Sequence, residues 1–186
     1  IGFAGDKNPG ASNDTEEYNS GFNPGAGPAV WISIASAPSG LRQGSGMGTT
    51  EAFLGATAYT MPSNKVFEYD GTNWTNGGAM GSARYSFAGC GGTQTAAFIC
   101  GGTDNNNTTN PQAVMTEEYN GTAWSPTGNL NTARLAGSAS TGSQTAGLAF
   151  SGGIAGPDRT AATEEYNGSS WTSSSSLSQK RSNVGG

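Results

Sequence analysis

The stretch Glu118-Tyr119-Asn120-Gly121-Thr122-Ala123-Trp124 decides the fold, because the chain carries the same pattern of residues four times. A Glu-Tyr pair is followed by Trp, five residues after the Tyr in three copies and thirteen in the first. An Arg follows each Trp by 10 or 11 residues, and the tyrosines recur every 47 to 51 residues. A fixed period of this length is typical of proteins built from repeated supersecondary units.

The repeated residues form three aligned rows. The members are Tyr18, Tyr69, Tyr119 and Tyr166; Trp31, Trp74, Trp124 and Trp171; and Arg42, Arg84, Arg134 and Arg181. The first copy is longer because residues 21–28 read as a loop inserted between its Tyr and its Trp.

Each unit divides into four predicted strands. The pair Asn120-Gly121 and its counterparts suit a two-residue hairpin turn with positive φ, so the Tyr ends one strand and the Trp begins the next. After the Arg come a strand of small residues such as 85–90 or 135–140, a polar turn, and an apolar strand such as 96–101. Four strands in about 50 residues describe one blade of a β-propeller.

A strand ending in Gly101-Gly102 or Gly152-Gly153, then a Tyr, a Trp and an Arg, resembles the kelch repeat. The resemblance covers nearly the whole chain, although the spacing from Tyr to Trp is shorter than in typical kelch units. The amino-acid sequence of residues 116–124 also resembles kelch-like repeats in predicted structural and tail proteins of environmental bacteriophages. The resemblance implies a β-propeller in a virion or an extracellular setting.

We expect one all-β propeller domain over residues 1–186. Its predicted blades are 1–41 together with 181–186, then 42–83, 84–133 and 134–180. The first and last strands would then pair within one blade and close a four-bladed ring that has no open edge. The alternative is four consecutive blades of a larger ring.

Composition excludes several functions. The net charge is −5 with 8 Lys and Arg residues, which argues against a nucleic-acid partner. No apolar run approaches the roughly 18 residues needed to cross a bilayer, so we expect no membrane insertion. The chain has no His, which removes the commonest general base and the commonest metal ligand. We therefore expect no enzyme, no cofactor and no metal site.

The periodic residues are interpreted as scaffold. The Tyr and Trp rows are expected to be inter-sheet core rather than an exposed platform for sugars. The Arg row equals in number a Glu row, which suggests an ion pair or hydrogen bonds repeated in each blade. The members of that Glu row are Glu17, Glu68, Glu118 and Glu165.

Cys90 and Cys100 lie on successive predicted strands at equal distances from Thr95 in the turn between them. They are placed to face each other across the hairpin. The sequence leaves both a disulfide and two buried thiols open.

The candidate binding residues lie on the connections that fail to repeat, because binding residues concentrate on such loops. The most distinctive is 103–110, whose oxygen-rich side chains suit a glycan or a weak Ca²⁺ contact as well as plain solvation. The candidates are Asp104, Asn105, Asn106, Asn107, Asp158, Arg159, Asp6 and Lys7.

The predicted function is a structural or binding module of a virion or tail fibre. Its loops would contact other virion proteins, cell-surface proteins or a surface glycan, and the module would belong to a larger, oligomeric assembly. One alternative is a secreted bacterial propeller for carbohydrate binding or adhesion. Two others, a propeller enzyme and an intracellular scaffold, fit the sequence less well. A glycosidase needs two opposed carboxylates, and the strongly placed acids here are periodic.

Overall fold

The computed structural model of the chain describes residues 2–3, 6–7, 10–11, 15–19, 30–38, 45–56, 63–87, 89–104, 113–135, 139–154 and 158–182. The named elements in these ranges are strands, and they form antiparallel sheets. This confirms the predicted all-β class. The reason lies in the repeat, since short apolar runs alternate with turn residues at every boundary.

Within the described ranges, three sheets have four strands each and the same order along the chain. The first consists of β6 (Ser45–Gly48), β7 (Phe53–Ala56), β8 (Val66–Tyr69) and β9 (Trp74–Asn76). The second consists of β10 (Gly89–Thr93), β11 (Ala96–Cys100), β12 (Thr116–Tyr119) and β13 (Trp124–Thr127). The third consists of β14 (Ala139–Ser143), β15 (Ala146–Phe150), β16 (Thr163–Tyr166) and β17 (Trp171–Ser174). The sheets lie inside the intervals 42–83, 84–133 and 134–180.

The chain before residue 35 adds a three-stranded sheet of order β1-β4-β5 and a short hairpin. Its strands are β1 (Gly2–Phe3), β4 (Thr15–Asn19) and β5 (Val30–Ile34), and the hairpin is β2 (Asp6–Lys7) with β3 (Gly10–Ala11). Tyr18 pairs with Trp31 in the register that the other three sheets use for their own Tyr and Trp. The strand expected at 181–186 falls, beyond residue 182, outside the described residues.

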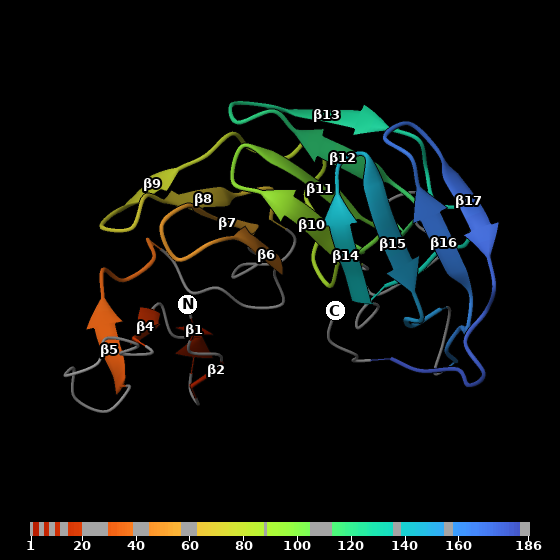
Figure 1. Cartoon of the computed structure of the whole chain (residues 1–186), viewed down its shortest axis with the longest axis horizontal. Coiled ribbons are helices and arrows are strands. Elements are labelled where there is room, and N and C mark those ends of the chain that lie inside the picture. The colour runs from red at the N-terminus through yellow and green to blue at the C-terminus, as the bar shows by residue number, and fades with distance from the viewer. Residues whose placement is uncertain are drawn as a thin grey trace, which may run out of the picture.

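The three four-stranded sheets follow one another around an arc, with β10 lying between β6 and β14 (Figure 1). These innermost strands need small residues. A Cβ added to Gly91 on β10 would lie 3.0 Å from the carbonyl oxygen of Gly142 on β14 and 2.7 Å from the Phe98 ring. The indole N–H of Trp74 donates to the carbonyl of Ala35 at 2.9 Å, which joins the segment after β5 to the β6–β9 sheet.

The hydrophobic core lies between neighbouring sheets. One cluster joins Leu54, Val66 and Met80 of the β6–β9 repeat to Ile99, Tyr119 and Trp124 of the next sheet. A second joins Phe98, Cys100 and Leu130 to Ala149, Tyr166 and Trp171. The β10–β13 sheet therefore buries both of its faces against neighbouring sheets, which stabilises it by about 25 cal/mol per Å² of apolar surface.

The hairpin turn after each Tyr differs in detail from the prediction. The Asn120 amide donates to the Ala123 carbonyl at 3.2 Å, so Gly121 and Thr122 are the central residues, and Gly121 has a φ of 89°. Asn120 is a cap rather than a central residue, since its Oδ1 accepts from the N–H groups of Thr122 and Ala123 at 3.0 and 2.9 Å. Asp70 does the same for Thr72 and Asn73, and those two hydrogen bonds lower its pKa.

The strand predicted at 85–90 begins later. β10 covers Gly89–Thr93, and Tyr85 forms an isolated bridge with Thr103 instead. The strand predicted at 135–140 is displaced in the same way, to Ala139–Ser143, and Leu135 bridges Gly153. In both repeats the residues after the Arg complete backbone hydrogen bonds at the edge of the sheet before the inner strand starts.

The register argues against the predicted facing of the cysteines. Cys90 pairs with Ile99, and Cys100 pairs with Gly89. The two cysteines are therefore offset by one residue in the register and do not lie directly opposite each other on the two strands.

Candidate functional site

In each four-stranded sheet, the connection between the second and third strands leaves from the same end of the strands, because the three sheets share one topology. They span residues 57–65, 101–115 and 151–162. The base of the second is anchored by backbone hydrogen bonds from Gly101 to Met115 at 2.8 Å and from Thr103 to Tyr85 at 2.9 Å. Two of these connections carry the predicted binding residues that lie beyond β5.

Asp104 follows the anchored Thr103 and is half-buried. Asn105, Asn106 and Asn107 lie outside the described residues. Asp6 and Lys7 lie on β2, where their backbones pair with Ala11 and Gly10.

Asp158 and Arg159 lie exposed on the third connection, and the structure brings them together with Lys180 and Ser182. Lys180 Nζ lies 3.3 Å from Asp158 Oδ2, and Arg159 Nε donates to Ser182 Oγ at 2.6 Å. The hydrogen bond from the Arg159 amide to Asp158, together with Lys180, lowers the pKa of Asp158. An exposed ion pair contributes little to stability, so these charges remain accessible to a partner.

The Glu row has a different role from the predicted one. Tyr166 donates its hydroxyl hydrogen to Glu118 of the preceding sheet at 2.7 Å, and Tyr119 donates to Glu68 at 2.5 Å. Burial is the main cause that raises the pKa of Tyr119 above its ordinary value, and the hydrogen bond to Glu68 adds to it. The tyrosines therefore join sheets as hydrogen-bond donors as well as through their rings.

Arg84 and Arg134 each pair with the glutamate one position before the Glu row. Arg134 Nη2 lies 2.5 Å from Glu164, and Arg84 Nη2 lies 3.0 Å from Glu117. The prediction that the Arg row pairs with Glu118 and its counterparts is wrong, because neighbouring strand residues face opposite sides of the sheet. Glu117 and Tyr119 face the β6–β9 sheet, whereas Glu118 faces the β14–β17 sheet.

The arginines of the two buried ion pairs differ in the number of additional hydrogen bonds that they make. Arg134 also donates to the carbonyls of Ser151 and Ala162, at 3.0 and 3.1 Å, and both Arg134 and Glu164 are fully buried. Arg84 is equally buried, but its guanidinium nitrogens have no well-directed hydrogen bond within the described part of the chain. Burial lowers the pKa of Arg84, and the charge of Glu117 opposes this.

The burial of the other residues in the Tyr, Trp and Arg rows differs from one repeat to the next. Tyr69, Tyr119, Tyr166, Trp124 and Trp171 are buried, and Trp74 is half-buried. Arg181 is exposed. Arg42 lies outside the described residues, and Tyr18 and Trp31 are placed by their backbone pairing.

Two glutamines that sequence analysis missed also join the sheets. Gln144, in the β14–β15 turn, donates from Nε2 to the carbonyls of Ala97 and Tyr119 at 2.9 and 2.7 Å. Gln94 donates in the same way to Phe53 and Tyr69. The signal was present in the sequence, since both glutamines precede a Thr in equivalent turns.

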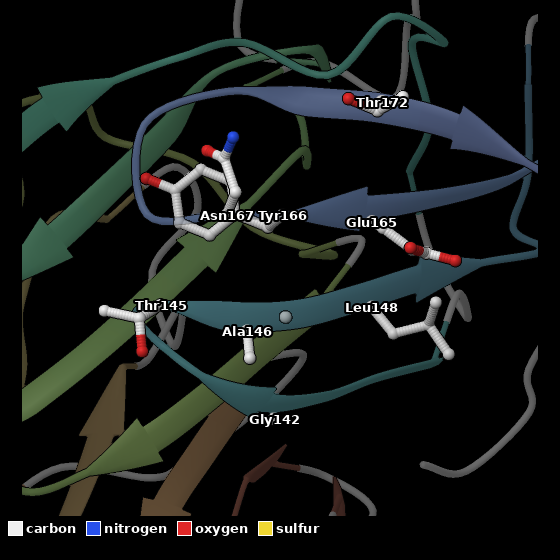
Figure 2. Close-up of a pocket in the computed structure, with 9 residues that line it drawn as sticks. Gly142, Thr145, Ala146, Leu148, Glu165, Tyr166, Asn167 and Thr172 are labelled. Atoms are coloured by element: carbon white, nitrogen blue, oxygen red, sulfur yellow. The ribbon is translucent and has the colours of Figure 1, made fainter.

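A cavity of about 550 Å³ opens on the face of the β14–β17 sheet that has no sheet following it along the chain. Leu148, Glu165 and Thr172 line it, with Thr145 and Asn167 toward the turns (Figure 2). In Figure 2, Leu148 and Glu165 project from the adjacent strands β15 and β16. Phe98 and Leu54, the residues equivalent to Leu148 in the other two sheets, are buried.

Over the described ranges, no three His, Cys, Asp or Glu side chains are grouped so that they would hold a metal ion. The same ranges contain no helix with the length and apolar character of a membrane span. Neither a protein-family model nor a curated protein matches the sequence.

Proposed function

We propose that the chain is a kelch-like, four-bladed β-propeller without enzymatic activity, which displays its loops to a partner protein or a surface glycan. The proposed setting is a virion or tail fibre. The N-terminal and C-terminal strands share one blade and close the ring.

The proposal rests on one observation: several residues that recur in every repeat are buried between sheets, whereas residues that do not recur are exposed on a connection between strands. The periodic Arg134, Tyr119 and Trp171 are used in joints between sheets. The non-periodic Asp158 and Arg159 are exposed on a connection between strands. A rigid scaffold that presents variable loops is the arrangement by which many binding modules work.

The structural contacts of the glutamate side chains support a binding role rather than a hydrolytic one. Glu117 and Glu164 are held in buried ion pairs, and Glu68 and Glu118 accept hydrogen bonds from tyrosines. A glycosidase needs two carboxyl groups facing each other across a substrate, and these four are engaged in structural contacts. A copper site of the galactose-oxidase type needs histidine, and the chain has none.

Two loop variants test the proposal. One replaces residues 104–107 by alanine, and the other combines Asp158→Ala, Arg159→Ala and Lys180→Ala. A matched control carries Thr72→Ala and Thr122→Ala, two exposed turn positions between third and fourth strands, at the opposite sheet edge.

Binding is measured on a glycan array and by adsorption to bacterial cell envelopes. At least one loop variant is expected to lose about ten-fold in affinity, equal to roughly 1.4 kcal/mol, while the control binds as the parent does. Unchanged binding in both loop variants would place the site elsewhere. Glycan binding without envelope adsorption would favour a secreted carbohydrate-binding module.

A further inference from the structure

The last four-stranded sheet carries an unfilled copy of the face that the other sheets use to hold their neighbour. We call this the receiving face, and its residues are Leu148, Thr163, Glu165, Ser174 and Leu177. Strand register and distance from the Trp identify the same positions in the preceding sheet. They are Phe98, Thr116, Glu118, Thr127 and Leu130.

In the preceding sheet these positions hold the Tyr and Trp of the next repeat. The Tyr166 hydroxyl lies 2.7 Å from Glu118 and 2.8 Å from Thr127 Oγ1. The Trp171 indole N–H donates to Thr116 Oγ1 at 2.9 Å. One carboxylate and two hydroxyl groups of the preceding sheet thus form hydrogen bonds with the phenol and the indole of the next repeat.

On the receiving face the same polar groups lack those partners in the described part of the chain. Glu165 is exposed and accepts a hydrogen bond from Ser174 Oγ at 2.7 Å. Thr163 is only 9% exposed, and its buried Oγ1 has no hydrogen-bond partner among the described residues. A buried hydroxyl of this kind costs free energy until it is paired.

The apolar positions agree. Phe98 and Leu130 are buried in the joint. Leu148, which lines the cavity of about 550 Å³ (Figure 2), and Leu177 are only half-buried. Arg181 is exposed, although Arg134 at the equivalent position is fully buried against Glu164.

We propose that the receiving face binds the β4–β5 hairpin of the same chain. Tyr18 donates to Glu165, the Trp31 indole donates to Thr163, and Arg181 pairs with Glu16. This inference rests on the proposed closed ring and specifies the side chains that close it. Tyr18 and Trp31 already share the Tyr-Trp register of the filled joints.

One departure on the receiving face selects this hairpin over a regular one. A Cβ on Gly128 would lie 2.1 Å from the carbonyl oxygen of Ser169, in the turn of the next sheet. Four residues after Trp171 the equivalent position is Ser175, so a turn seated like that of Ser169 would collide with its side chain. The connection from β4 to β5 is ten residues long, 20–29, whereas the connection that contains Ser169 has four residues, 167–170.

The hairpin and the face belong to one chain, which favours the intramolecular contact. A tethered partner acts at an effective concentration near the millimolar range, well above that of a second copy in dilute solution.

The test uses the full chain labelled with ¹⁵N, in which four tryptophans give four indole N–H signals. Trp31→Phe identifies the Trp31 signal. Thr163→Val removes one hydroxyl with little change of shape. It is expected to shift the Trp31 signal and to speed its hydrogen exchange about five-fold, as the loss of one hydrogen bond does.

Thr116→Val is the matched control, because it does the same to Trp171 at a joint that the structure shows. If Thr116→Val moves the Trp171 signal while Thr163→Val leaves Trp31 unchanged, the proposal is overturned. A Trp31 signal that depends on dilution, with a dimer in sedimentation, overturns it in favour of a second copy.

Glu165→Gln is a second variant, should Thr163→Val fold poorly. It is expected to let one tyrosine lose its proton at a lower pH than in the parent, because the neutral amide no longer opposes a phenolate charge, and an unchanged tyrosine titration counts against the proposal. The loop variants of the preceding subsection do not touch this face. Loss of the joint with binding retained would therefore leave the display function standing, and the reverse would leave the joint standing.

Discussion

Tyr166 donates its hydroxyl hydrogen to Glu118 across the boundary between two sheets, at 2.7 Å. Tyr119 makes the same contact with Glu68 one sheet earlier. Glu117, next to Glu118 in sequence, faces the opposite side of its sheet and holds Arg84 instead. Two adjacent glutamates therefore serve two different joints, and strand alternation assigns each to its partner.

The tyrosine joints predict a loss of stability in alkali. Burial raises the pKa of Tyr119 and Tyr166 above the ordinary value, with their glutamates adding to the effect. The folded state therefore holds these protons more tightly than the unfolded chain does. The stability is present below about pH 10 and falls as the pH rises beyond it.

The measurement is the urea midpoint of unfolding between pH 8 and pH 11. The Tyr119→Phe, Tyr166→Phe double variant is expected to show a shallower decline than the parent, because two of the linked protons are gone. Equal slopes for the two proteins would contradict a role for the hydroxyl groups.

The buried ion pairs predict unequal costs of removing an arginine. Arg134→Met leaves Glu164 charged and buried without its partner, so we expect a loss of about 3 to 5 kcal/mol in unfolding free energy. Arg84→Met is expected to cost less, since Arg84 has fewer well-directed hydrogen bonds to lose. Urea unfolding of both variants measures the difference.

Lys180→Met is the control for removing a positive charge, because the Lys180 side chain is 62% exposed in its ion pair with Asp158. It is expected to change the unfolding free energy by less than about 0.5 kcal/mol. Equal costs for Arg84→Met and Arg134→Met would mean that the two joints are equivalent after all.

The fold class was predictable because each repeat contains residues that mark where its strands end and begin. Tyr119 ends a strand and Trp124 begins the next, and the Gly between them supplies the positive φ of the turn. The partner of the Arg row was not predictable in the same way. Glu117 and Glu118 differ by one residue, and a shift of one residue changes the face of the sheet.

The candidate site was only partly predictable. Asp158 and Arg159 were found because they break the repeat, and the structure shows them exposed. Gln94 and Gln144 were missed because a polar residue in a turn is ordinary, and its reach to the neighbouring sheet depends on packing. The receiving face was missed because its residues are of the same chemical type as their counterparts, and what distinguishes them is their exposure.

The tryptophan joints predict a stabilising substitution. Trp171 has Thr116 as its acceptor, but the equivalent position facing Trp124 is Val66, and the Trp124 indole N–H has no partner among the described residues. Val66→Thr supplies a hydroxyl of nearly the same shape. It is expected to stabilise the fold by up to about 1 kcal/mol.

Thr116→Val is the reciprocal change and is expected to destabilise the fold by about 1 to 2 kcal/mol. Thermal unfolding of both variants beside the parent gives the comparison. A destabilised Val66→Thr variant would show that the Trp124 site does not accept the bond.

The glutamine turns predict a specific loss. Gln144 donates two hydrogen bonds to backbone carbonyls of the preceding sheet, so Gln144→Met leaves the carbonyls of Ala97 and Tyr119 without these donors. We expect a cost of about 2 kcal/mol in urea unfolding. Gln144→Glu keeps the shape but removes the amide donors, and a variant as stable as the parent would refute the role of the amide.

The most direct test of the repeated joint, and of its use to close the chain, is a pair of double-mutant cycles in urea unfolding. One cycle combines Tyr166→Phe with Glu118→Gln, and the other combines Tyr18→Phe with Glu165→Gln. We expect a coupling energy of about 1 to 2 kcal/mol, of the same sign, in both cycles. Coupling in the first cycle with none in the second would contradict closure of the chain through Tyr18 and Glu165.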